Sequence, residues 1–380
     1  MIHGTHLWTQ TLLSSTLIAT AAYGQTVIKI AVVGPLTGPS AHYGKDNERG
    51  AQMAIDDLNQ RKVKLAGKPV RFELVSEDDH ADAAKAAELA KKLVALKVNG
   101  VVGHNNSGAT LSAAQIYNTA GLVNITPAAT NPKLTKLGYK ATFRTIAHDG
   151  LMGNALASHA VAKLKVRDAA IIHDGTSYGQ ALAQEFEATF QSFGGRIVER
   201  HTVDSKTVDF SALSSSLAAK KPQLIFFGGL DNQAGPLLQQ LKINGLEKVP
   251  FMGGDGICSA DMPKLSGGAA GAQVICADGG EALTNTVQGR EFAQRFKQRY
   301  SADVLSNAAL AYDNTLLLAE AMRISGSSDP SNYVDALSKI KFNGGISGMI
   351  EFDGSGQRKK AAVTLSHYPT GIKTSLTTMK

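Results

Sequence analysis

The chain has 380 residues, of which 43% are hydrophobic and 38 are glycine, a composition typical of a globular α/β protein of one to three domains. Its formal net charge is +7, but Lys and Arg are scattered in pairs such as Lys91-Lys92 and Lys359-Lys360 and form no long basic block. Because nucleic-acid-binding proteins gather positive charge on one face or segment, we exclude nucleic acid as a partner.

A short apolar segment near the N-terminus runs from Leu12 to Ala22, and Ala22-Tyr23-Gly24 resembles a signal-peptidase cleavage site. The segment is too short to span a bilayer. We therefore interpret residues 1–24 as a signal peptide cleaved near Gly24, which makes the protein an exported one. The alternative is a disordered tail or a misplaced start codon, since no Lys or Arg precedes Leu12.

From Val27 onward, short apolar segments alternate with segments of helical spacing. Predicted strands cover residues 27–34, 70–75, 101–102, 122–125, 141–144, 169–173, 196–202, 224–227, 251–257 and 272–277. Predicted helices cover residues 47–60, 82–96, 110–120, 151–164, 180–193, 210–219, 232–243, 290–300, 307–322 and 331–339. Segments 346–352 and 361–366 are predicted to form a hairpin around Asp353-Gly354-Ser355-Gly356.

Strands that alternate with helices predict an α/β fold with parallel sheets, either one barrel or two open sheets. Polar loops follow strands in both halves of the chain, at Tyr43, Ser107, Thr130, Tyr178 and Asp255. We favour two sheets, because two lobes that close over a cleft would bring loops of both halves together.

The segment of residues 100–135 is the clearest candidate for half of a binding site. One polar loop, Gly103 to Gly108, follows a predicted strand and precedes a helix, and a second, Pro127 to Pro132, follows the neighbouring strand. Parallel sheets bind ligands at the carboxyl ends of their strands, and a helix N-terminus attracts carboxylates and phosphates. The segment therefore predicts a site for a small anion.

Motifs for the common nucleotide and hydrolase chemistries are absent from the sequence. The first strand ends in Gly34-Pro35-Leu36-Thr37-Gly38, which is not a dinucleotide fingerprint, and neither a phosphate-binding loop nor a nucleophile elbow occurs. The histidines lack metal-binding spacing, and Asp78-Asp79-His80 is better explained as a polar strand end. We expect no cofactor, no metal and no enzymatic activity, with Asp255 as the charge partner of a ligand cation.

The sequence contains two cysteines, Cys258 and Cys276. In an exported protein, two cysteines favour one disulfide, which here would close a loop of 18 residues and stabilise the fold by roughly 3 kcal/mol. The alternative is a pair of free, buried thiols.

Several segments in fixed order together resemble one protein family. They are IAVVGPLTGPSAHYGKD, GHNNSGAT, ITPAATNPKLT, HDGTSYGQALA, FFGGLDNQAGPLLQQLK and FMGGDGI. They are similar to type I periplasmic substrate-binding proteins of ABC transporters, in the leucine/isoleucine/valine-binding group, and the resemblance covers residues 25–380.

This resemblance implies two Rossmann-like lobes with parallel central sheets, joined by three crossovers. Lobe 1 would comprise residues 25–147 and about 280–350, and lobe 2 residues 148–279 and about 351–380. It also implies a monomeric periplasmic receptor, which binds a free amino acid between its lobes and delivers it to an inner-membrane ABC permease.

The resemblance also assigns roles to residues of this sequence. The Ser107 hydroxyl and the Thr130 N–H would bind the ligand carboxylate, and the Ala128 carbonyl, the Thr130 hydroxyl and Asp255 would bind its ammonium group. Tyr43, Tyr178 and Leu230 would form the walls. A zwitterion held in a closed cleft needs both charges satisfied, because an unpaired buried charge is very costly.

The sequence departs from the family at Asn105 and Asn106, where leucine-binding members have apolar residues and a cysteine. The disulfide that those members carry would match Ala81 and Asn106, so it is absent here. The expected ligand is a branched-chain or other hydrophobic amino acid, with a broader or more polar range left open. Alternatives are a receptor for an amide, urea or aromatic acid, a hydrolase or transferase that uses Ser107 or Asp255, and a sensor domain.

Overall fold

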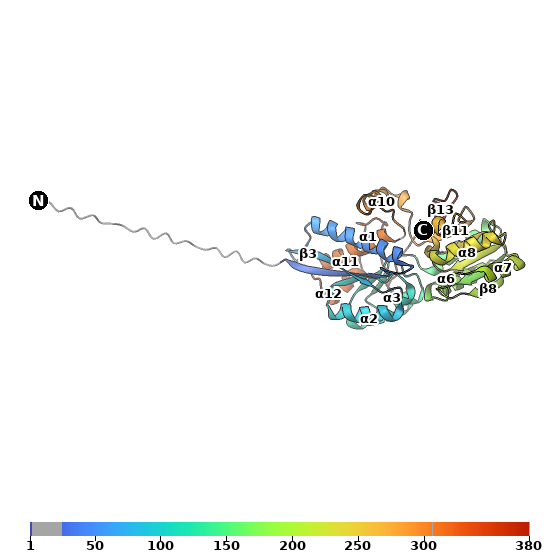
Figure 1. Cartoon of the computed structure of the whole chain (residues 1–380). Helices are drawn as coiled ribbons and strands as arrows, with labels where there is room; N and C mark the ends of the chain where they lie inside the picture. The colour runs from blue at the N-terminus through green and yellow to red at the C-terminus, as the bar shows by residue number, and fades with distance from the viewer. Residues whose placement is uncertain (2–24, 306, 380) are drawn as a thin grey trace.

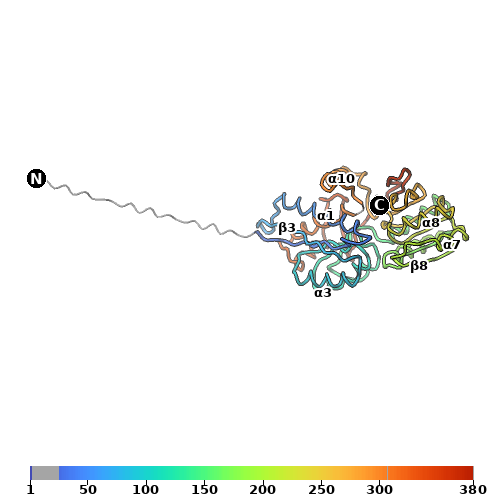
Figure 2. Tube along the Cα trace, viewed as in Figure 1, coloured from blue at the N-terminus to red at the C-terminus, as the bar shows by residue number. Residues whose placement is uncertain are grey.

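The computed structural model describes Met1 and residues 25–305 and 307–379. Two α/β lobes lie side by side, as Figures 1 and 2 show, and each contains its own sheet. The predicted α/β class and two-lobe architecture are confirmed. The predicted signal peptide, residues 1–24, falls almost wholly outside the described residues. Within the described part of the chain, no helix has both the length and the apolar character needed to cross a membrane.

The first lobe is built on a sheet that has six strands within the described residues, in the order β2-β3-β1-β4-β5-β6. All neighbours are parallel except the short β2–β3 pair. The central strand β1 is buried along its second half because helices cover both faces of the sheet. The strands are β1 (Thr26–Gly34), β2 (Lys64–Leu65), β3 (Lys68–Asp78), β4 (Gly100–Gly103), β5 (Asn124–Thr126) and β6 (Thr142–Arg144).

The helices of the first lobe include three from the C-terminal part of the chain. Asp82 caps the N-terminus of α2 by accepting a hydrogen bond from the Lys85 N–H, and Gly121 ends α3 with a left-handed conformation. The helices are α1 (Ala41–Gln60), α2 (Ala83–Ala95), α3 (Ser107–Ala120), α4 (Lys133–Lys136), α10 (Val287–Tyr300), α11 (Ala308–Ser325) and α12 (Pro330–Ser338).

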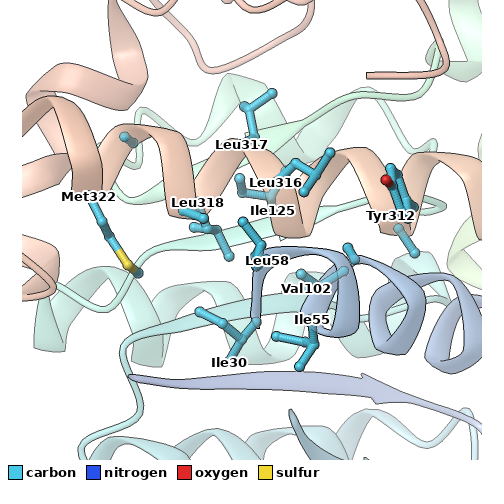
Figure 3. Close-up of a cluster of buried hydrophobic side chains, with 14 of the residues drawn as sticks. Ile30, Ile55, Leu58, Val102, Ile125, Tyr312, Leu316, Leu317, Leu318 and Met322 are labelled. Carbon is cyan, nitrogen blue, oxygen red and sulfur yellow. The ribbon is translucent and has the colours of Figure 1, made fainter. Parts of the chain in front are cut away.

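Helices α1 and α11 pack against each other and against one face of this sheet (Figure 3). Ile55 and Leu58 of α1 meet Leu316 and Leu317 of α11 in one buried cluster with strand residues such as Val102. Full burial of each such side chain contributes about 1.5–3 kcal/mol. The cluster therefore anchors a helix from the end of the chain to the strands at its beginning.

The second lobe is built on a sheet with seven strands among the described residues, in the order β13-β12-β11-β10-β9-β7-β8. Strands β7 to β11 are parallel, whereas β12 pairs antiparallel with both β11 and β13. The strands are β7 (Asp168–His173), β8 (Arg196–Thr202), β9 (Leu224–Gly228), β10 (Phe251–Gly253), β11 (Val274–Asp278), β12 (Val363–His367) and β13 (Thr374–Met379).

The predicted C-terminal hairpin is wrong in its pairing. The turn at Asp353 exists, with single bridges between Phe352 and Arg358 and between Phe342 and Ile350. The predicted partner strand, however, forms β12 and pairs with β13, the final segment of the chain. The alternating polar residues of Thr374–Met379 were overlooked because this edge strand is largely exposed and lacks an apolar face.

The helices of the second lobe cover both faces of its sheet. Phe186 of α6 stacks on Phe226 of β9 with ring centroids 4.0 Å apart, at the centre of one core, and Phe227 belongs to the core on the other face. The helices are α5 (Asp149–Ala162), α6 (Ser177–Ser192), α7 (Ser211–Lys220), α8 (Asp231–Ile243) and α9 (Met262–Leu265), with the 3-10 turn η1 (Asp255–Ile257). A second 3-10 turn, η2 (Leu283–Asn285), belongs to the first lobe, where it packs with α10.

Within the described residues, the chain crosses between the lobes three times: after β6, after β11 and before β12. Phe352 still packs in the core of the first lobe, whereas Val363 packs in that of the second. The Arg144 N–H donates to the Gly356 carbonyl at 2.9 Å, and the Arg144 carbonyl accepts from the Arg358 N–H at 2.9 Å. The first and third crossings therefore run side by side as a paired connection; the exact residue bounds proposed for the lobes stay a prediction.

Cys258 and Cys276 form a disulfide with their Cα atoms 5.4 Å apart, as predicted. Cys276 lies in β11, and Cys258 immediately follows the η1 turn that contains Asp255. The bond therefore ties a loop at the strand ends of the second lobe to its sheet.

Candidate functional site

A cavity lies between the lobes, at the carboxyl ends of strands from both sheets. Eight of the nine side chains predicted for the site line it, and Gly256 and Asn307 line it in addition. The lining residues are Tyr43, Asn105, Asn106, Ser107, Ala128, Tyr178, Leu230, Asp255, Gly256 and Asn307. The structure thus brings the predicted residues together, although no bound molecule tests their roles.

The predicted residue that does not line the cavity is Thr130. It is fully buried, and its carbonyl accepts a hydrogen bond from the Asp149 N–H at 3.0 Å. Its hydroxyl makes no hydrogen bond of standard geometry with a described residue, but it lies close enough to the buried Asp149 carboxyl group to lower the pKa of that acid. A ligand group that binds the Thr130 hydroxyl would therefore also meet Asp149.

Ser107 is the first residue of α3, where the backbone N–H groups of the first turn have no partners within the helix. Its hydroxyl oxygen accepts a hydrogen bond from the Asn131 N–H at 3.3 Å, which leaves the hydroxyl proton free to donate. A donating hydroxyl beside a helix N-terminus favours an anionic group.

The second polar loop, residues 127–132, is held by two buried side chains. The Thr126 hydroxyl oxygen accepts from the N–H groups of Ala128 and Ala129 and donates to the His104 carbonyl. The buried Arg144 guanidinium donates to the Asn131 carbonyl at 2.7 Å and to the Gln357 side chain at 2.6 Å. The loop is thereby fixed both to the first polar loop and to the paired connection between the lobes.

The two tyrosines join the lobes around Gly256. The Tyr43 hydroxyl on α1 donates to the Gly256 carbonyl at 2.8 Å. The Gly256 N–H donates to the Tyr178 hydroxyl at 2.9 Å, and that hydroxyl donates to Asp255 Oδ1 at 2.8 Å. An added Cβ at Gly256 would lie 2.6 Å from the Gly229 carbonyl oxygen, so this close packing needs glycine. Both phenol groups are therefore used within the protein and form walls.

Asp255 is buried at the edge of the cavity. Burial, helped by the Asp278 charge and opposed by the Tyr178 hydrogen bond, raises the pKa of its carboxyl group to about 7. A positively charged ligand group would favour the ionised form and return the pKa toward its usual range.

Sequence reasoning missed a second buried carboxyl group, Asp149, at the start of α5. Its side-chain oxygens make no hydrogen bond of standard geometry with a described residue, although the Thr130 hydroxyl lies close enough to interact with them. Burial raises the pKa of Asp149 well above the ordinary value and the nearby Asp255 raises it further, whereas the Thr130 side chain and the Arg144 charge lower it. Its position just after the predicted strand 141–144, at a helix start, was the signal available in the sequence.

The neighbouring histidine does not neutralise Asp149. Burial and the charge of Arg144 together lower the pKa of His148 to about 4, so the imidazole is neutral at pH 7. None of the described residues that line the cavity is Lys or Arg. The buried Arg144 guanidinium interacts with Asp149 and lowers its pKa, so Asp149 is partly compensated within the protein. Asp255 lines the cavity without a lining cation, which favours a ligand that carries positive charge, because an uncompensated buried carboxylate is costly.

The geometry gives little support to nucleophilic catalysis at Ser107. Both ring nitrogens of His104 are engaged, Nδ1 with Asp79 at 2.7 Å and Nε2 with the Tyr117 hydroxyl at 3.0 Å. These three buried residues brace the first polar loop against the end of β3. Across the described residues, His, Cys, Asp and Glu also form no group of three or more that could hold a metal ion.

Two α/β lobes with a cavity between their strand ends, lined by polar side chains of both lobes, define a two-lobe ligand-binding receptor. Comparison with known sequences agrees: the family model described as "Periplasmic binding protein" matches residues 27–370, and the chain belongs to this family. The recognition made from the sequence motifs is confirmed.

Individual relatives place the chain more closely. It is 32% identical over 339 residues to the leucine-, isoleucine-, valine-, threonine-, and alanine-binding protein of Pseudomonas aeruginosa, which covers 89% of each chain. A leucine-binding protein from Thermotoga maritima has a TM-score of 0.85 at 25% identity, covering 93% of this chain and 99% of that one. A branched-chain amino-acid binding protein from Streptococcus pneumoniae, solved with isoleucine, has a TM-score of 0.84 at 26% identity, covering 93% and 99%.

Proposed function

We propose that the protein is a periplasmic receptor that binds a free amino acid between its lobes and delivers it to an inner-membrane ABC permease. The observation that carries this proposal is the division of charge in the site. Asp149 and Asp255 supply two buried acids from the second lobe, whereas Ser107 and the N-terminus of α3 supply hydrogen-bond donors from the first. This arrangement suits the ammonium and carboxylate groups of a zwitterion.

The roles of individual residues follow from this division. The Ser107 hydroxyl and the Thr130 N–H would bind the carboxylate, and the Thr130 hydroxyl, the Ala128 carbonyl and the two acids would bind the ammonium group. Tyr43, Tyr178, Leu230, Asn105 and Asn106 would surround the side chain. The names of the relatives support an amino acid of the branched-chain or other hydrophobic class.

Ligand binding would be coupled to closure of the lobes. Three hydrogen bonds already cross the cleft: Tyr43 to Gly256 at 2.8 Å, His42 to Asp231 at 3.0 Å, and the Asn131 side chain to the Ser177 carbonyl at 2.6 Å. A zwitterion that contacts both lobes favours the closed state over any open one, as differential binding requires. A monomer in this closed state would then dock on the permease.

A receptor for an amide, urea or organic acid is the alternative on the same fold. An organic acid would leave Asp149 and Asp255 without a cation, and a neutral amide would neutralise neither. The charges of the cavity therefore favour the amino acid, and a hydrolase role lacks a free base beside Ser107.

The test is a thermal-shift screen of the protein, first unfolded and refolded to remove bound ligand. The panel would contain the twenty amino acids, their decarboxylated amines, urea, acetamide and benzoate. A ligand at one hundred times its Kd stabilises the folded state by about 2.7 kcal/mol, which shifts the melting temperature measurably. We expect shifts with amino acids and none with amines or acids alone. A shift confined to benzoate, urea or amides would contradict the proposal.

A further inference from the structure

Two asparagines occupy the N-cap positions of helices that begin at the cavity. Asn106 precedes α3, Asn307 precedes α11, and both line the cavity. An N-cap asparagine normally accepts a hydrogen bond from the second or third N–H of its helix. Here neither side chain makes such a bond. Their amide groups are therefore free for another partner.

The N-terminus of α11 is capped by a residue of another helix. The Asp46 carboxylate of α1 accepts hydrogen bonds from the Ala308 N–H at 2.9 Å and the Leu305 N–H at 3.0 Å. Since Asp46 satisfies the start of the helix, Asn307 is not needed there. Its side chain makes no hydrogen bond with another described residue and lies at the cavity wall.

At α3 the cap is left open. The side-chain oxygen of Asn106 is buried and has no partner among the described residues. The neighbouring Asn105 uses only one of its two side-chain polar groups. Its amide oxygen accepts a hydrogen bond from the Asn47 side chain at 2.6 Å, whereas its amide nitrogen has no partner in the described chain. Three amides from two segments of the first lobe thus face one cavity with unused hydrogen-bonding capacity.

An aliphatic ligand side chain would bury these amides without partners. A ligand with a hydroxyl or carboxamide group would supply both a donor and an acceptor in the same space. Sites built to hydrogen-bond a ligand group discriminate strongly against an analogue that lacks it, because their own polar groups are then left unpaired.

We infer that Asn105, Asn106 and Asn307 form a side-chain subsite that selects amino acids with a hydroxyl or carboxamide group over aliphatic amino acids of the same size. This inference rests on the proposed amino-acid receptor, but it assigns a polar ligand side chain where the names of the relatives favour a hydrophobic one. Asn106 is the central determinant, because its buried oxygen requires a donor from the ligand.

The test compares pairs of ligands of matched shape by isothermal titration calorimetry on the refolded protein. Threonine and valine differ by one hydroxyl group in place of a methyl group, and asparagine and leucine have similar shapes. We expect threonine to bind at least tenfold more tightly than valine, and asparagine more tightly than leucine. In Asn106→Leu the ratio of threonine to valine affinity should fall at least tenfold.

Asn307→Leu is the second variant, in case Asn106→Leu does not fold, and it should lower the same ratio. The matched control is Asn343→Leu, because Asn343 is exposed and does not line the cavity; its ligand ratio should equal that of the wild type. Equal or tighter binding of valine by the wild type would overturn this inference while leaving an amino-acid receptor. Binding of no amino acid at all would overturn the proposed function as well.

Discussion

The two halves of the cleft use different chemistry. The first lobe presents neutral groups, namely the Ser107 hydroxyl, the open N-terminus of α3 and the side-chain amides, whereas the second places Asp255 at the cavity wall and Asp149 buried behind it. The acids that would hold a ligand ammonium group therefore come from the second lobe alone. This difference indicates how ligand binding would favour closure of the lobes. A ligand with two opposite charges would interact with both lobes at once only when they are closed.

The lobes also brace their loops differently. In the first lobe the buried Asp79–His104–Tyr117 group joins the loops after β3 and β4. In the second, a disulfide joins the loop after β10 to β11. A noncovalent brace and a covalent one therefore perform the same task at the two sides of one cavity.

The largest effect should come from removing an acid of the second lobe. Asp149→Asn leaves the ligand ammonium with one buried partner fewer, and loss of one partner of a buried pair costs about 3–5 kcal/mol. We expect affinity for the preferred amino acid to fall at least a hundredfold, measured by calorimetry. Asp335→Asn, on the exposed face of α12, is the control. An affinity within threefold of the wild type would remove Asp149 from the site.

Removal of the Cys258–Cys276 disulfide should lower the free energy of unfolding more than it lowers ligand affinity. The double variant Cys258→Ser/Cys276→Ser should lose roughly 3 kcal/mol of unfolding free energy, the value for a loop of this length. The measurement is urea unfolding followed by circular dichroism. Tryptophan fluorescence is unsuitable, because the single tryptophan, Trp8, lies in the predicted signal peptide. A midpoint equal to that of the wild type would show that the bridge contributes nothing.

The neutral half should contribute less than the acids. Ser107→Ala removes one hydrogen bond to a charged group, worth about 1.5–3 kcal/mol, so we expect a ten- to hundredfold weaker affinity by calorimetry. The loss should be the same for every amino acid, since the carboxylate is common to all. A loss that varied with the ligand side chain would place Ser107 in the side-chain subsite instead.

The smallest effect on ligand affinity should come from the hydrogen bond between His42 and Asp231, which crosses the cleft. Burial lowers the pKa of His42, but the hydrogen bond to Asp231 and the charges of Asp231, Asp261 and Asp46 raise it above 6.5 overall. If the open state lacks this contact, protonated His42 favours closure fully below pH 6.5. This stabilisation of the closed state is lost as the pH rises through the raised pKa that His42 has in that state.

The measurement is the affinity of wild type relative to His42→Gln between pH 5 and 9. The ratio should be about two- to fivefold at low pH, the value of a partly exposed ion pair, and should approach one at high pH. The absolute affinity of both proteins should fall at low pH, because protonation of Asp255 below about pH 7 weakens binding of an ammonium group. This effect is common to wild type and variant and therefore cancels in the ratio. A ratio independent of pH would contradict the role of His42.

Much of this fold could be predicted from the sequence. The regular alternation of apolar and helical segments located most elements to within a few residues, and buried strands such as β4 and β9 were clear because both faces are apolar. Strand β13 was missed since its exposed, polar residues carry no such pattern. Asn307 was missed as a lining residue because α11 reaches the first lobe only through tertiary packing.

The site residues that lie beside strand ends in sequence, such as Ser107 and Ala128, could be placed together from sheet topology alone. Asp149 could not, because its importance comes from complete burial beside a second acid, Asp255, which no local pattern encodes. The division of the N-cap roles among Asp46, Asn106 and Asn307 likewise depends on contacts between distant helices.

Arg144 gives the cleft a mechanical property. Its backbone pairs with the third crossing between the lobes, while its guanidinium grips the loop of residues 127–132 that borders the cavity. One residue therefore connects the segment that joins the lobes to the loop that borders the cavity. A ligand that displaced this loop would also strain the connection, so ligand contact and the angle between the lobes would be coupled through Arg144.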